Sequence, residues 1–331
     1  MIVGKSIRIL GLAKYLPRVV LSSEIEQAYG LPIGWSEEHS GVKSRHHVTF
    51  ESNGYMGARA LENVMEKCNL KMKDIDLLIS AGGSFDYVIP NQSSVIKSEL
   101  TGGNTVDIPT IDIDTVCLSF ISAFEIAASL LDGKKYKTIA IVCSEISSKG
   151  LNPQNPETLT LFGDGAVAAL LQYDTNSDSL YIKSLQKTYS EGIEYAIIKG
   201  GGGKYHFKDY PYDSAFHSFN MNGVRLLRLI KSKLSSFTTE FFDDLPVNFP
   251  DVDCIIIHQA SKAGISMFTD FYHPKKDQLK GNLIDHGNCI AASIPMILCD
   301  AIESGEIKRG AICFLIGSSA GVSVGGLLLK F

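Results

Sequence analysis

Three side chains in the sequence could together transfer an acyl group: Cys117, His258 and Asn288. A cysteine thiolate attacks a carbonyl carbon, and imidazole and carboxamide groups can donate hydrogen bonds to the oxyanion that forms. Each residue also has a structural interpretation: Cys117 and His258 as buried core residues, and Asn288 as a turn residue. Each lies at the end of a predicted strand or just before a predicted helix, where catalytic groups collect in parallel α/β sheets, so together they favour an acyl-transfer site.

The segment around Cys117 predicts a turn between a buried strand and a buried helix. Residues 111–113 alternate with aspartates, and residues 120–130 show the apolar spacing of a helix. A helix N-terminus offers free N–H groups and the positive end of a dipole, both of which stabilise a thiolate. We therefore expect the thiolate form of Cys117 to be favoured over the thiol.

Alternating strand and helix patterns on either side of a polar segment, residues 173–179, predict two halves, 1–174 and 175–331. This alternation is typical of α/β folds with covered sheets. The predicted strands are 6–16, 75–81, 111–113, 138–143, 167–172, 180–185, 252–258, 311–316 and 322–331, and the predicted helices are 55–68, 90–100, 120–130, 219–237, 259–271 and 291–302.

The two halves share an order of elements, which predicts an internal duplication. Each half has a buried strand followed by a helix, and then closing strands after a glycine-rich turn. We expect the helix after Cys117 to correspond to the helix after His258.

Composition excludes several classes of protein. The chain has 331 residues, of which 45% are hydrophobic, and a net charge of −5, so nothing indicates a nucleic-acid partner. No apolar run is long enough to span a membrane, and the N-terminal segment is typical of a first strand and not of a signal peptide. Seven widely spaced cysteines, without metal-ligand spacing, favour a reducing cytoplasm and no metal site.

Five motifs in order carry a family resemblance. The chain resembles β-ketoacyl-acyl-carrier-protein synthase III and its relatives in the thiolase superfamily, over essentially its whole length. The motifs are Gly41-Val42-Lys43-Ser44-Arg45-His46, Asp114-Thr115-Val116-Cys117, Phe162-Gly163-Asp164-Gly165-Ala166, Ile257-His258-Gln259-Ala260, and His286-Gly287-Asn288 with Ala291-Ala292-Ser293-Ile294-Pro295.

The resemblance implies a thiolase-like fold in which two duplicated βαβαβαββ halves form a five-layered αβαβα sandwich, usually as a homodimer. It also implies a decarboxylative Claisen condensation. Cys117 would take an acyl group from a thioester, and neutral His258 and Asn288 would stabilise the enolate formed from a malonyl thioester. The backbone N–H groups of Cys117 and Ala320 would form the oxyanion hole. No permanently bound cofactor is implied, only acyl-CoA or acyl-carrier-protein thioester substrates.

The sequence departs from the family where relatives bind coenzyme A. Relatives primed by acyl-CoA commonly hold the adenine between a Trp and an Arg. Trp35 matches the Trp, but an Arg expected close after it is replaced by His39, and the Arg before the Phe-Gly-Asp-Gly turn by Pro156. Because the guanidinium fork of Arg is hard to replace at a phosphate, we expect a carrier-bound acyl donor or a differently held coenzyme A. Alternatively, Lys43 or Lys149 supplies the missing charge.

Two further positions match family residues that meet the carrier protein or its pantetheine arm. Arg228 matches a cation of the long second-half helix that contacts the acidic carrier, although this face could also be merely solvated. After the His-Gln-Ala motif, an Asn and an Arg of the family are replaced by Ser261 and Ala263. Ser261 could still bond pantetheine, and Lys262 is the remaining candidate for carrier docking there.

Two other functions stay open. The same acyl-cysteine site could transfer the acyl group to another nucleophile, or join two acyl thioesters in a specialised pathway, without malonyl decarboxylation. The chain could also be a non-catalytic subunit of a heterodimeric synthase, although such subunits tend to lose the nucleophile and Cys117 is present.

Overall fold

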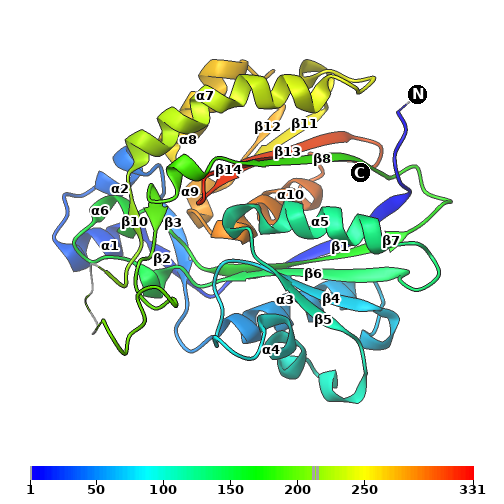
Figure 1. The fold of residues 1–331 in the computed structure, drawn as a ribbon, viewed down its shortest axis with the longest axis horizontal. Helices are drawn as coiled ribbons and strands as arrows, with labels where there is room; N and C mark the ends of the chain where they lie inside the picture. Colours follow the sequence, from blue (N-terminus) through cyan, green and yellow to red (C-terminus); the bar gives the residue numbers. More distant parts are fainter. Residues whose placement is uncertain (1, 211–212, 214–215) are drawn as a thin grey trace.

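The computed structural model describes residues 2–210, 213 and 216–331 and shows five layers. Two five-stranded sheets lie above one another in Figure 1, with a pair of helices between them and further helices on each outer face. The predicted αβαβα sandwich is therefore confirmed.

The first half builds the first sheet in the strand order β1-β7-β6-β4-β5. β4 pairs in parallel with β5 and β6, and β7 pairs antiparallel with β1 and β6. The elements of this sheet and its helices are β1 (Ile7–Tyr15), α3 (Asn53–Lys67), β4 (Leu77–Ala81), α4 (Gln92–Glu99), β5 (Thr110–Ile113), α5 (Ser119–Leu130), β6 (Thr138–Glu145) and β7 (Gly165–Tyr173).

The second half repeats this arrangement in the order β12-β11-β13-β14-β8. β11 pairs in parallel with β12 and β13, and β14 pairs antiparallel with β13 and β8. The corresponding elements are β8 (Leu180–Thr188), α7 (Gly223–Phe242), β11 (Cys254–Ile257), α8 (Lys262–Tyr272), β12 (Leu279–Lys280), α10 (Ser293–Glu303), β13 (Ile312–Ser319) and β14 (Ser323–Lys330).

The strand orders show which elements correspond, and they correct one expectation. α5 and α10 each follow the edge strand of their sheet, β5 and β12, so α5 corresponds to α10. His258 follows β11, whose counterpart is β4. The helix after Cys117 therefore does not correspond to the helix after His258, because strand order in space, which the sequence did not show, decides the match.

The strand before Cys117 was also predicted wrongly as buried. β5 is an edge strand, and Ile111 and Asp112 at its centre are exposed. Four helices begin later than predicted: α4 at Gln92, α7 at Gly223, α8 at Lys262 and α10 at Ser293. Ser261, which precedes α8, is its N-cap and accepts a hydrogen bond from Gly264 N at 3.1 Å, so the chain from His258 to Ser261 is not helical.

The middle layer, α5 and α10, forms the largest apolar core. Phe120, Phe124, Ile294 and Leu298 are almost fully buried, and they belong to one cluster with side chains of both sheets. Because most residues of α5 and α10 are apolar and buried, the two helices are stabilised by packing between two sheet faces. α3 and α4 cover the outer face of the first sheet, and α7 and α8 cover that of the second (Figure 1).

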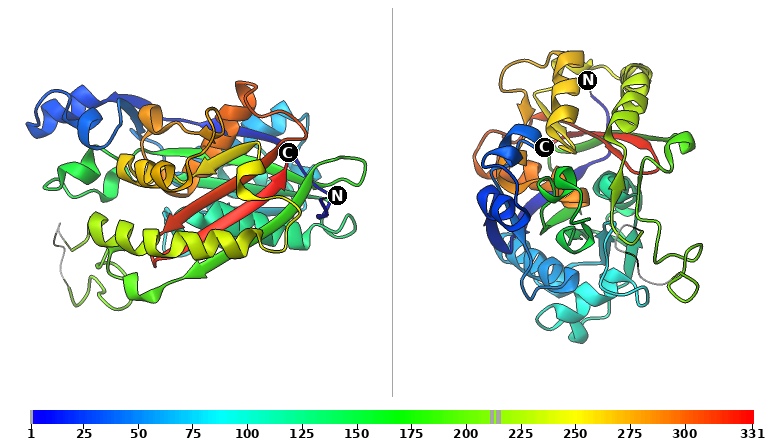
Figure 2. Two further views of the ribbon diagram at one scale, coloured as in Figure 1. Left: turned by 90° about the horizontal axis from the view of Figure 1, so that it is seen from above. Right: turned by 90° about the vertical axis from the view of Figure 1, so that its left-hand side faces the viewer.

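Shorter elements gather at one end of the sandwich, on the left-hand side of Figure 1 and of the left view in Figure 2. They are β2 (Arg18–Leu21), α1 (Ser22–Tyr29), α2 (Trp35–His39), β3 (Ser44–His47), α6 (Pro156–Leu159), β9 (Ala196–Ile197), β10 (Asn220–Met221) and α9 (Leu283–His286).

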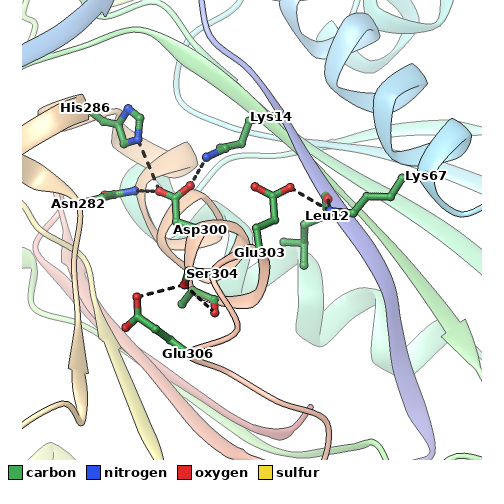
Figure 3. A network of polar contacts seen from close by, with 10 residues as sticks. Leu12, Lys14, Lys67, Asn282, His286, Asp300, Glu303, Ser304 and Glu306 are labelled. Carbon is green, nitrogen blue, oxygen red and sulfur yellow. Dashed lines mark hydrogen bonds and ion pairs between the residues drawn. The ribbon is translucent and has the colours of Figure 1, made fainter.

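A polar network around Asp300 of α10 joins the two halves (Figure 3). Its carboxylate pairs with Lys14 of β1, accepts a hydrogen bond from Asn282 and lies 3.5 Å from Nε2 of His286. Asn282 precedes α9 and His286 is its last residue, two positions before Asn288. One carboxylate thus ties the Asn288 segment to the first half of the chain.

This network makes stability depend on pH. Burial opposes ionisation of Asp300, but hydrogen bonds from His286, Lys14 and Asn282 lower its pKa from 3.8 to about 2. Because the folded-state pKa is lower, the contribution of about 2 kcal/mol is complete above pH 4 and disappears as the pH falls to 2. We expect Asp300→Asn to lower the free energy of unfolding by about that amount at pH 7 in urea titrations.

The control is Asp178→Asn, at an exposed position, which should leave the urea midpoint unchanged. The difference between wild type and Asp300→Asn should shrink between pH 4 and pH 2. A difference that stays constant over this range would contradict the role given to the Asp300 carboxylate.

Candidate active site

One cavity of about 460 Å³ lies between the two halves and has the size of a small-ligand site. Its lining includes Cys117, His258, Asn288 and Ala320. The structure therefore brings together the three predicted catalytic residues and the backbone of the predicted oxyanion loop.

Cys117 lies in a 3₁₀ turn, Val116–Leu118, directly before α5. Val116 has a φ of 54°, a left-handed conformation that is strained for a β-branched residue. The Asp114 carboxylate stabilises this turn by accepting a hydrogen bond from Val116 N at 2.8 Å. The strained turn places the half-buried thiol at the cavity wall.

The expected preference of Cys117 for the thiolate form is wrong. Burial and, to a lesser degree, the nearby Glu145 carboxyl raise the pKa of Cys117 to about 12. A backbone hydrogen bond lowers this pKa, as expected at a helix start, but it does not outweigh burial. Cys117 is therefore a thiol at neutral pH.

His258 is a neutral imidazole that packing holds in place. Its backbone N–H donates to Ile316 O at 2.8 Å, and a Cβ added to Gly317 would lie only 2.7 Å from its own Cβ. Burial lowers the pKa of His258 to about 4. Neither ring nitrogen has a hydrogen-bond partner among the described residues, so the ring N–H is available to a ligand in the cavity.

The carboxamide of Asn288 also presents a donor to the cavity. Its Oδ1 accepts a hydrogen bond from Ile290 N at 2.9 Å, and its Nδ2 donates to Ala260 O at 3.2 Å. The backbone of Asn288 pairs with the segment before the Phe-Gly-Asp-Gly motif, through Leu161 O at 2.9 Å. One N–H of the carboxamide thus positions the side chain and leaves the second for a bound carbonyl oxygen.

Ala320 lies in the tight turn between β13 and β14, opposite Cys117 in the cavity lining. β13 extends through Ser319, so only residues 320–322 form the turn, and the predicted five-residue loop is shorter than expected. Ser318, Ser319 and Gly321 line the cavity beside Ala320.

The four predicted binding residues lie away from the nucleophile. Trp35 of α2 stacks on His39 with ring centroids 4.1 Å apart, and Lys262 donates to the carbonyl oxygen of Glu38 at 2.8 Å. Ser261 lines a smaller cavity of about 90 Å³ that shares His258 with the first. Arg228 is exposed on α7.

Comparison with known proteins agrees with this site. Sequence models described as 3-oxoacyl-[acyl-carrier-protein (ACP)] synthase III and as its C-terminal part match residues 111–190 and 243–331, more than half of the chain. The chain belongs to the 3-oxoacyl-[acyl-carrier-protein] synthase III family. A β-ketoacyl-[acyl-carrier-protein] synthase III of Vesicomyosocius okutanii is 28% identical over 99% of this chain and 100% of its own length.

Solved structures of synthase III proteins show the same fold. The 3-oxoacyl-[acyl-carrier-protein] synthase III of Aquifex aeolicus superposes with a TM-score of 0.86 at 23% identity, covering 98% of this chain and 100% of its own. The priming β-ketosynthase of the R1128 polyketide pathway superposes with a TM-score of 0.88 at 21% identity, covering 100% and 98%.

Sequence reasoning missed one buried acid beside the site of this synthase III family member. Glu145 ends β6, and burial is the main reason that its pKa is raised to about 7. The predicted strand stopped at Cys143. The sequence contained one indication of this acid: a carboxyl group directly after the apolar run Thr138–Ser144. Acidic side chains are rarely buried without a partner, so one at the end of a buried strand indicates a special role.

Two structural findings concern other classes of site. Within the described ranges, no group of three or more His, Cys, Asp or Glu side chains is arranged to hold a metal ion. No helix in the same residues has both the length and the apolar character to cross a membrane.

Proposed function

We propose that this chain catalyses a decarboxylative Claisen condensation in which Cys117 carries the acyl group and His258 and Asn288 bind the malonyl thioester. The observation that carries the proposal is the single cavity lined by all three side chains and by the Ala320 turn. Membership of the synthase III family, a family of condensing acyltransferases, supports the same chemistry.

In the first step, the sulfur of Cys117 attacks the carbonyl carbon of an acyl thioester. The backbone N–H groups of Cys117 and Ala320 stabilise the tetrahedral oxyanion, and the donor leaves as a thiol. Because the pKa of Cys117 is raised, its proton must leave during the attack. Neutral His258 lines the same cavity and can accept this proton, since burial keeps it unprotonated.

In the second step, the malonyl thioester loses CO₂ and the electron pair of the broken C–C bond forms an enolate. His258 and Asn288 each donate one N–H to the enolate oxygen, and both donors are fixed before the ligand binds. The enolate carbon then attacks the acyl-Cys117 carbonyl, and the cysteine thiolate leaves to give the β-ketoacyl product.

Substitutions should separate the two steps. We expect Cys117→Ala to abolish the mass increase that wild type shows after incubation with acyl thioesters. Asn288→Ala should keep that adduct, whereas His258→Ala should also slow its formation, because His258 accepts the thiol proton; both should lower CO₂ release and condensation by about 10²–10³-fold each. Intact-mass spectrometry and ¹⁴CO₂ release measure the two steps.

An acylated enzyme that transfers its acyl group without CO₂ release would contradict the decarboxylating reaction and favour transfer to another nucleophile. Absence of an adduct with every donor would contradict Cys117 as the acyl carrier. Gly202→Ala, in a loop where an added Cβ meets no neighbour within 4 Å, is the control for nonspecific effects.

The acyl donor is proposed to be bound to an acyl carrier protein. Arg225, Arg228 and Lys231 are exposed along α7, a helix whose Leu226 lines the cavity, and this basic face suits an acidic carrier. His39 stacks on Trp35, and position 156 is Pro where the family has Arg. Both features weaken the contacts by which family members bind coenzyme A. Lys262 is engaged by α2, so Arg228 is the stronger candidate for the contact.

Charge reversal on α7 should raise the KM for the carrier-bound donor. We expect Arg228→Glu to raise the KM for acyl-carrier protein by about tenfold, in line with the loss of a few charge contacts, and to leave kcat unchanged. Lys73→Glu, an exposed charge reversal in the first half, is the matched control. Equal turnover of acyl-CoA and acyl-carrier donors by wild type would contradict the preference for a carrier.

We also propose a homodimer joined through β5. This edge strand pairs only with β4 in the described residues, and Ile111 on it is exposed. Val88 and Ile89, 86% and 87% exposed, lie in the loop before α4, whose first N–H groups bind Asp112 of β5. An unpaired edge with apolar neighbours is suited to pairing with a second copy by two-fold symmetry.

Sedimentation should give twice the mass of the chain for wild type. Ile111→Lys should shift the equilibrium towards monomer, because it places a charge on the unpaired edge. Val3→Lys, at a distant exposed position, should leave the dimer intact. A monomeric wild type would overturn the proposal.

A further inference from the structure

Glu145 is a buried carboxyl group that links two segments of the cavity wall. Its side chain is completely buried. One oxygen accepts a hydrogen bond from Gly83 N at 2.8 Å, and the other accepts one from the Ser84 hydroxyl. The backbone N–H of Ala291 also donates to this carboxylate. Gly83 and Ser84 follow β4 and line the cavity, whereas Ala291 follows Asn288.

Both of these segments contact the turn that carries Cys117. A Cβ added to Gly83 would lie 3.5 Å from Cα of Val116, the residue before the nucleophile. The turn Ile290–Ala292 packs against both β6 and the Val116–Leu118 turn. Movement of the Glu145 carboxylate would therefore release both neighbours of Cys117.

The charge of Glu145 is not balanced by a cation. Within the described ranges, neither Lys nor Arg is among the groups that shift its pKa. The titratable groups around it are acidic, thiol or neutral. The Asp114 carboxyl raises the pKa of Glu145. Glu145 in turn raises the pKa of three thiols, those of Cys117, Cys143 and Cys289. The pKa of His258 is lowered by burial alone.

We propose that Glu145 is a positioning residue that fixes the two segments around Cys117 and, when ionised, adds to the effect of burial in opposing the thiolate form of Cys117. The proposal rests on Cys117 as the nucleophile of the proposed function. Two negative charges in one buried region are unfavourable, so the Glu145 carboxyl and the Cys117 thiol titrate as a coupled pair. Below about pH 7 the Glu145 carboxyl is protonated and neutral. Above about pH 7 it is negatively charged and repels a thiolate at Cys117.

The pH profile of Cys117 alkylation tests this coupling without any acyl substrate. For wild type, the rate with iodoacetamide should rise tenfold per pH unit up to about pH 7 and then flatten up to about pH 9, because ionised Glu145 opposes thiolate formation. For Glu145→Gln the rise should continue, giving at least a tenfold faster rate than wild type at pH 9. Peptide mass spectrometry assigns the alkylated residue, and Cys117→Ala gives the background.

Ser84→Ala is the matched control, because it removes one hydrogen bond of Glu145 and keeps the charge. Its profile should still flatten, but from a higher pH than in wild type, because the Ser84 hydrogen bond lowers the pKa of Glu145. A wild-type rate that rises tenfold per unit through pH 9, or a Glu145→Gln profile that flattens like wild type, would overturn the proposal. If Glu145→Gln does not fold, as thermal denaturation would show, the wild-type profile alone decides. If the alkylation profile shows this coupling but no thioester acylates the protein, the proposed function is contradicted and the role of Glu145 is not.

Discussion

The contact between α5 and α10 is the constraint on which the rest of the structure depends. Most side chains of both helices are apolar and buried, and each sheet covers one side of the pair. This packing brings the strand ends of the two halves to one cavity. Cys117 lies directly before α5, and Asn288 lies shortly before α10. Burial of two helices thus positions groups that are 171 residues apart in the sequence.

The same burial sets the charge of the site. It raises the pKa of Cys117 and lowers that of His258, so both side chains are neutral at pH 7. A neutral imidazole donates one hydrogen bond and can accept a proton, which suits binding of a carbonyl oxygen better than an imidazolium would. Glu145 is the exception, since it carries charge near neutral pH without a cation. The charge of the cavity at a given pH therefore depends on which of the Cys117, His258 and Glu145 side chains are protonated.

Polar contacts between the halves keep the catalytic segments in register. The Asp300 carboxylate on α10 holds Lys14 of β1 and the residues at the two ends of α9, just before Asn288 (Figure 3). Glu145 on β6 links the turn after β4 to the turn after Asn288. Each link joins a segment of the first half to one of the second.

The sequence by itself determined the alternation of strands and helices, the two halves and the three side chains suited to acyl transfer, because periodicity and motif spacing are local properties. It could not show that β5 is an edge strand, that α5 corresponds to α10, or that Lys262 binds the carbonyl of Glu38. These depend on strand order and on contacts between distant segments. The protonation of Cys117 was also decided by the tertiary structure, since burial and Glu145 outweigh the helix start that the sequence revealed.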